Sequence, residues 1–181
     1  GVMRWYQVMA SGEEEERLFE AAEKGEVEEV KRLLQDGANA NSRNSSHETV
    51  LMLAVGRGEE EIVRVLLANQ ADLNAKNNVG CTALMIAVKG GHTGVLSVLL
   101  AEGVDINARN KRGQTALLLG VRTGNVDIVR VLLEKGADVN LSDKKGYFPL
   151  LEATYGNDKK MADLLVEYGA VTDDPNLTLL L

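Results

Sequence analysis

Residues 77–109 read NNVGCTALMIAVKGGHTGVLSVLLAEGVDINAR, and their pattern decides the fold. The pattern recurs without gaps at a step of 33 residues, in the segments 44–76, 110–142 and 143–175. A fixed period of this length indicates stacked units, each of which buries its apolar face only against its neighbours. The chain is therefore predicted to form an extended array rather than one closed globule.

Each unit is predicted to contain two short helices behind a polar turn. In the quoted stretch the turn contains Gly80, which can supply a positive φ, and Thr82 is placed to cap the first helix. That helix is predicted over residues 83–88 and the second over residues 93–101, with Gly103 as its C-terminal cap. Helices this short are marginal in isolation, so the units should be stable only when stacked.

The composition narrows the class of protein. Hydrophobic residues make up 45 % of the 181 residues and aromatic residues only 4 %, which suits thin layers of short aliphatic helices. The net charge of −7 argues against general affinity for nucleic acid. No apolar run approaches the roughly 18 residues of a transmembrane helix. One cysteine allows no intramolecular disulfide, so an intracellular location, cytoplasm or nucleus, is expected.

The two ends depart from the repeat. Residues 13–43 lack the usual turn, and their acidic run Glu13–Glu16 suits a helix N-terminus, so they are expected to form an N-terminal capping unit. Residues 1–12 are a non-repeat segment whose apolar side chains either pack on the first unit, belong to a docking segment or are foreign to the natural chain. Residues 176–181 form an apolar tail that either folds back over the last helices or continues into further protein.

These units resemble the ankyrin repeat. The resemblance is carried by Gly80-Cys81-Thr82-Ala83-Leu84, by Gly91-His92 and by LLEKGADVN at residues 132–140, and it covers about residues 13–175. It implies an all-α solenoid of about five helix–turn–helix units with projecting turns. Three departures stand out: His47 and Gln70 replace expected glycines, and Phe148 replaces the threonine of the last unit.

The resemblance also implies a non-catalytic protein-interaction module, an adaptor or scaffold that is monomeric as an isolated domain. Family contacts come from positions two, three and five of each unit and from the end of its first helix. Here those positions carry seven cations and one anion, which predicts a basic concave face for an acidic protein partner. The predicted partner-binding residues are Arg57, Lys89, Lys111, Arg112, Gln114, Arg122, Lys144, Lys145, Tyr147 and Tyr155.

Other interpretations stay open. The cations could be an ordinary solvated rim on a structural spacer. They could also form a sensor for a small anionic nucleotide-like ligand, with Lys89, Lys111, Arg112 and Tyr147 as its contacts. No cofactor, metal site, membrane contact or catalytic residue is predicted, since His92 fits a structural position and Cys81 is expected to be an exposed residue at a turn tip.

A modification is implied by the resemblance alone. Asparagines at the end of the family's Asp-Val-Asn pattern can be hydroxylated by an oxygen-dependent asparaginyl hydroxylase, which favours a leucine eight residues earlier. The corresponding asparagines are Asn74, Asn107 and Asn140, and their leucines are Leu66, Leu99 and Leu132.

Overall fold

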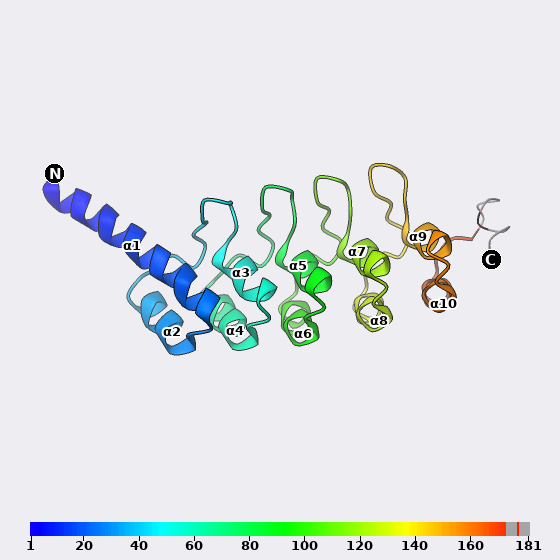
Figure 1. Ribbon diagram of the computed structural model, residues 1–181, viewed down its shortest axis with the longest axis horizontal. Helices are drawn as coiled ribbons and strands as arrows, with labels where there is room; N and C mark the ends of the chain where they lie inside the picture. Colours follow the sequence, from blue (N-terminus) through cyan, green and yellow to red (C-terminus); the bar gives the residue numbers. More distant parts are fainter. Residues whose placement is uncertain (173–176, 178–181) are drawn as a thin grey trace.

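Ten helices stack in two rows in the computed structural model, which describes residues 1–172 and 177, with the backbone alone at residues 6–8, 10 and 11. Figure 1 shows α1, α3, α5, α7 and α9 in one row, the even-numbered helices in the other, and the turns before α3, α5, α7 and α9 projecting beyond the first row. The predicted all-α repeat solenoid is confirmed. The helices are α1 (Val2–Lys24), α2 (Val27–Gln35), α3 (Val50–Gly56), α4 (Glu60–Ala68), α5 (Ala83–Gly90), α6 (Thr93–Ala101), α7 (Ala116–Thr123), α8 (Val126–Glu134), α9 (Pro149–Tyr155) and α10 (Lys159–Glu167).

The threonine caps predicted for the first helices are present. Thr82 Oγ1 accepts a hydrogen bond from the backbone N–H of Met85 at 3.3 Å, and Thr49 and Thr115 make the equivalent bond at 3.2 Å. Each bond satisfies one of the N–H groups that a helix leaves open at its start. Phe148 has no such group, and α9 begins instead with a proline, which needs no N–H partner at this position.

Three positions of the repeating unit adopt a positive φ, and in most units each of these positions is a glycine. Two of the exceptions lie where the sequence lacks an expected glycine. His47 has φ 59° where Gly80 has φ 78°, and Gln70 has φ 66° where Gly103 has φ 79°. The third exception is Asn157, with φ 53°. Because a Cβ makes this region costly, the stack imposes its turn geometry on residues that disfavour it.

One hydrophobic core runs through the whole stack. Its layers use the same positions of every unit: Leu51, Leu84, Leu117 and Leu150 are each 1 % exposed. Complete burial of an aliphatic side chain contributes about 2 kcal/mol, and each unit obtains that burial only from its neighbours. Of the apolar tail, the structure describes Leu177, which is buried in this core, while the prediction for residues 176 and 178–181 lies outside the described residues.

Asparagines at the end of each unit hold the following unit in place. Asn74 Oδ1 accepts from the backbone N–H of Asp105 at 2.9 Å, and Asn107 Oδ1 accepts from that of Asp138 at 2.8 Å. Asn140 makes the same bond to Val171 at 3.0 Å. The asparagines predicted as hydroxylation sites are thus hydrogen-bond acceptors at the unit junctions.

The N-terminal region differs from the prediction. Helix α1 begins at Val2 rather than at Glu13, so Glu13–Glu16 lie inside a helix and not at its N-terminus. The preceding residues contain no proline, and only Gly12 weakens the helix there. Val2, Met3 and Met9 are exposed, and Figure 1 shows this end of α1 extending beyond the stack. These three side chains therefore do not pack on the first unit.

Candidate interaction surface

The first residue of each unit builds the projecting turn. Asn110 Oδ1 accepts from the backbone N–H groups of Arg112 and Gln114, at 3.0 and 2.9 Å. Asp143 Oδ1 makes the same two bonds, to Lys145 at 2.9 Å and Tyr147 at 3.0 Å. A side chain that closes its own turn in this way fixes the directions of the residues at positions two, three and five.

Neighbouring turns are also bonded to each other through their backbones. The N–H of Lys111 donates to the carbonyl of Val79 at 3.0 Å, and the N–H of Lys144 donates to the carbonyl of Arg112 at 2.9 Å. A Cβ at Gly113 would lie 2.9 Å from the Lys144 nitrogen, so glycine is required for this approach. The turns therefore present their side chains from a stacked, rigid edge.

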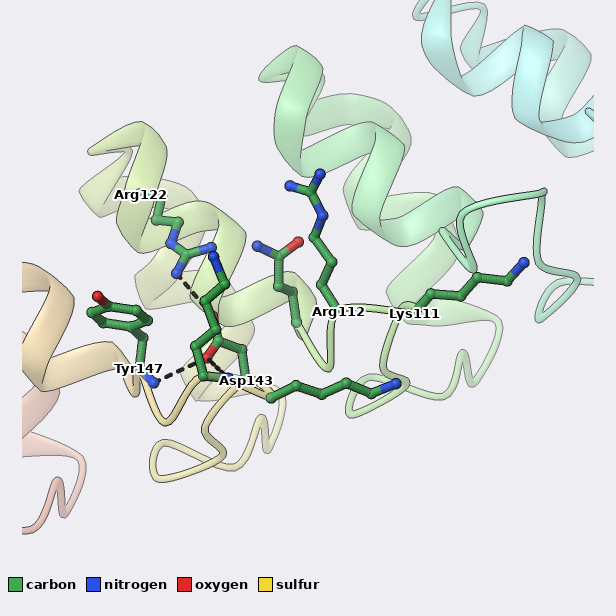
Figure 2. Close-up of a pocket in the computed structure, with 8 residues that line it drawn as sticks. Lys111, Arg112, Arg122, Asp143 and Tyr147 are labelled. Carbon is green, nitrogen blue, oxygen red and sulfur yellow. Dashed lines mark hydrogen bonds and ion pairs between the residues drawn. The ribbon is translucent and has the colours of Figure 1, made fainter.

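One cavity of about 440 Å³ lies between the last two turns and α7. We call it the Tyr147 pocket. It brings together seven of the predicted partner-binding residues, and it adds a carboxylate that the sequence analysis did not include. Figure 2 shows Arg122 and Tyr147 at one end of the group and Lys111 extending away from them. The pocket is lined by Lys111, Arg112, Gln114, Arg122, Asp143, Lys144, Lys145 and Tyr147.

Arg122 is the centre of an ion-pair network at one wall of the Tyr147 pocket. Its guanidinium lies 3.0 Å from the Asp143 carboxylate, 2.6 Å from that of Glu152 and 5.9 Å from the ring centroid of Tyr147. The hydrogen bond to Glu152, with a smaller contribution from Asp143, raises the pKa of Arg122. Arg122 is therefore a fixed, largely neutralised part of the wall.

Asp143 stays ionised in spite of its burial. Burial raises the pKa of its carboxyl, but the backbone hydrogen bonds from Tyr147 and Lys145, together with Arg122, outweigh burial, and the pKa lies below the ordinary aspartate value. The residue is 9 % exposed. A carboxylate here both closes the turn and anchors Arg122.

Four cations of the Tyr147 pocket have no acidic partner in the part of the chain that the structure describes. Within residues 1–172, no ion pair involves the charged groups of Lys111, Arg112, Lys144 or Lys145. Gln114, by contrast, is 8 % exposed, and its side-chain oxygen accepts from Asn110 at 2.8 Å. The turn tips thus carry the positive charge that is available to a ligand, while Gln114 lies on the pocket floor.

A second cavity of about 440 Å³ lies between α3, α5 and their turns. We call it the Gly56 pocket. Arg57 at its rim is paired with Glu23 of α1 at 2.8 Å, and Lys89 Nζ lies 3.8 Å from Cys81 Sγ. The pocket is lined by Glu48, Met52, Leu53, Gly56, Arg57, Asn77, Val79, Cys81, Ile86 and Lys89.

Cys81 corrects a sequence-based prediction. It was expected at an exposed turn tip, but it is 3 % exposed and belongs to the hydrophobic core. The equivalent residue of the next unit, Gln114, is likewise buried at 8 % exposure. His92 agrees with its predicted structural role, since its Nε2 lies 3.1 Å from the carbonyl oxygen of Gly56 in the preceding unit.

The predicted residues therefore divide between two sites. The cations of units 110–142 and 143–175 line the Tyr147 pocket, Arg57 and Lys89 line the Gly56 pocket, and Tyr155, which is 62 % exposed, lines neither. Two carboxylates, Asp143 and Glu152, lie among the predicted cations through their ion pairs with Arg122. The sequence does single out Asp143, because the first residue of each of the other three units is asparagine.

A family model described as ankyrin repeats (3 copies) matches residues 18–110 and 98–178, which is most of the chain. The protein belongs to the ankyrin repeat family. Ankyrin repeats generally mediate protein–protein interaction and are typically non-catalytic. A comparison with curated proteins finds no match.

Across residues 1–172 and 177, no group of three or more His, Cys, Asp or Glu side chains is placed to hold a metal ion. The same residues contain no helix with the length and apolarity to cross a bilayer.

Proposed function

We propose that this ankyrin-repeat chain is a protein-interaction module that binds an acidic segment of another protein at the Tyr147 pocket. The observation that carries the proposal is the group of four cations at the turn tips, Lys111, Arg112, Lys144 and Lys145, which lack acidic partners among residues 1–172. Positive charge concentrated on one edge of a protein with net charge −7 attracts an acidic partner and speeds its approach.

The pocket wall supports this assignment because it is rigid before any partner arrives. Asp143 and the stacked backbones of the turns fix the bases of the cationic side chains. Binding then orders only the ends of lysine and arginine side chains, which lowers the entropic cost. Tyr147, 37 % exposed and beside Arg122, offers a large, stiff apolar surface at the same place, and tyrosine is enriched at binding hot spots.

In this proposal the chain acts without catalysis, as an adaptor or a scaffold element inside the cell. Arg57, Lys89 and Tyr155 are secondary contacts along the same face, and Gln114 supports the pocket floor. The intracellular assignment rests on the single cysteine, which has no partner for an intramolecular disulfide.

The proposal is tested with a fluorescein-labelled peptide that carries an unbroken block of Asp and Glu residues. We expect binding by fluorescence anisotropy that weakens as salt rises and that falls at least tenfold in the Lys144→Glu, Lys145→Glu variant. The matched control is Lys159→Glu, Lys160→Glu, which makes the same charge change at exposed residues of α10.

Three results bear on the proposal. An equal loss of affinity in both variants would show that only overall charge matters, and the proposed site would be wrong. Undiminished binding in the Lys144→Glu, Lys145→Glu variant would also reject it. Competition by nucleoside triphosphates but not by an unlabelled acidic peptide would favour the small-ligand interpretation instead.

A further inference from the structure

The turn tips change character along the stack. At positions two and three of the units, the first two turns carry Ser45, Ser46, Asn78 and Val79, and the last two carry Lys111, Arg112, Lys144 and Lys145. Val79 is 57 % exposed, although it occupies a position that is polar or charged in the other three units. The interaction surface is therefore charged over its second half and uncharged at the turn tips of its first half.

The Gly56 pocket gives that uncharged half an apolar floor. Leu53 and Ile86 occupy position ten of their units and are half-buried beside the buried Met52. In the last unit the same position is Glu152, which pairs with Arg122. The two junctions thus differ at this position: Ile86 lines the Gly56 pocket, whereas the equivalent Glu152 pairs with Arg122 beside the Tyr147 pocket.

Gly56 contributes no side chain to its pocket. The equivalent residues of the next three units are Lys89, Arg122 and Tyr155, each of which projects a long side chain from the end of its first helix. A Cβ at Gly56 would meet only Ile86 Cγ2, at 3.6 Å, which is an ordinary contact distance. Gly56 is helical, so neither its backbone nor its surroundings require glycine.

The charged groups at the rim of the Gly56 pocket are mostly occupied. Arg57 is paired with Glu23, and Glu48 accepts from the side-chain amide of Asn77 at 3.0 Å. An aliphatic group entering this pocket therefore gains contact with Leu53 and Ile86 without breaking the ion pair. A charged group would gain little there, because few unpaired charges remain to meet it.

The two pockets are linked through neighbouring turns. Val79 lines the Gly56 pocket and Lys111 lines the Tyr147 pocket, and the Val79 carbonyl accepts the Lys111 N–H at 3.0 Å. The pocket centres are two units apart. With helices packed about 10 Å apart, that separation is about 20 Å. An extended peptide covers this distance in about six residues.

We infer that the Gly56 pocket binds one aliphatic side chain of the same partner segment whose acidic residues occupy the Tyr147 pocket. The partner is then an extended segment with a leucine-like residue about six residues from an acidic block. This inference rests on the proposed function, and it adds a second, apolar contact that charge alone does not provide.

The test uses labelled peptides with one acidic block, a Gly/Ser spacer and a single leucine placed three to nine residues from the block on either side. A leucine-free peptide is the reference. For each protein, the measured quantity is the ratio of affinities with and without leucine. We expect the ratio to peak at about tenfold when the spacing is about six residues, the gain from burying one leucine side chain.

The deciding variant is Gly56→Met, which fills the pocket with a side chain of the length that other units carry at this position. The leucine-dependent ratio should fall to about one in this variant. Ser97→Met, at an exposed position of α6, adds the same side chain away from the surface and should keep the wild-type ratio. Circular dichroism and thermal unfolding establish that both variants are folded.

The outcomes separate the two proposals. If the leucine-free peptide binds but leucine gives no gain at any spacing, or a gain that survives Gly56→Met, the inference is wrong and the proposed function stands. If the leucine-free peptide does not bind, the proposed function fails and the inference fails with it. Self-association of the wild type that Gly56→Met abolishes would identify a second copy as the occupant and would also overturn the inference.

Discussion

Arg122, near the end of α7, reaches across the junction between two units and lies 3.0 Å from the carboxylate of Asp143. The other repeats close the same turn with a neutral asparagine, such as Asn110, whose Oδ1 accepts the same two backbone bonds and whose side-chain amide donates to Gln114 at 2.8 Å. The change from asparagine to aspartate keeps the two backbone bonds and adds a charge. The residue that closes the turn thereby forms an ion pair between the last two units.

Removal of Arg122 should weaken this connection. In Arg122→Met the aliphatic stem stays packed, but Asp143 and Glu152 lose their cationic partner. We expect the free energy of unfolding to fall by about 1–2 kcal/mol, the loss for hydrogen bonds to partly buried charged groups. Urea unfolding measures it. Arg64→Met is the control, because its ion pair with Glu60 is solvent-exposed and should contribute little.

A double-mutant cycle identifies the residue through which Arg122 stabilises the junction. If Arg122 stabilises the junction through Asp143, the loss in Arg122→Met should be smaller in an Asp143→Asn background. Fully additive losses would show that Arg122 acts through other contacts.

Asp143 should also make the stability of the folded protein sensitive to acid. Its folded-state pKa is lowered, so its ionisation stabilises the protein fully above the unfolded-state pKa, about pH 4, and this contribution is lost as pH falls through the lower folded-state value. Asp143→Asn keeps the turn geometry but cannot titrate. The stability difference between wild type and variant should therefore shrink as the pH is lowered from 6 toward 2, measured by urea unfolding at each pH. A difference that is constant with pH would contradict this role.

The repeat pattern predicted what depends on local chemistry. The threonine caps, the bounds of α6 and the aliphatic core follow from residue types that recur at one spacing, and all three are present. The missed features depend on neighbours across units. Burial of Cys81 and the pairing of Arg122 with Glu152, 30 residues away, arise from the stacking of turns and helices. The start of α1 was missed because residues 1–12 have no repeat to align with.

Gln70 offers a test of the strain at unit ends. It adopts φ 66° where Gly37, Gly103, Gly136 and Gly169 recur, so Gln70→Gly should remove the steric cost of a Cβ in this region. The gain is partly offset by the greater freedom of glycine in the unfolded chain, which leaves about 0.5–1 kcal/mol of added stability. Thermal and urea unfolding measure it. Gln70→Ala keeps the Cβ and should show no such gain; an equal gain would point to the glutamine side chain rather than the backbone.

Hydroxylation of the junction asparagines stays a prediction with a direct measurement. Intact-mass analysis of protein from native cells should show the added mass of one oxygen atom for each modified site at Asn74, Asn107 or Asn140. Peptide fragmentation then assigns the residue. Unmodified protein from oxygenated cells that contain the hydroxylase would reject the prediction.

Substitutions of Tyr147 distinguish an aromatic contact from a charge contact at the proposed binding site. Its ring lies 5.9 Å from the Arg122 guanidinium carbon and remains partly exposed to the pocket. Tyr147→Phe keeps the ring, so the affinity for the labelled acidic peptide should change little. Tyr147→Ala removes an aromatic surface of the kind that forms hot spots, and affinity should fall about tenfold with an unchanged dependence on salt, because no charge is lost. An equal loss in both variants would assign the contact to the hydroxyl, and no loss in either would place the peptide on the cationic tips alone.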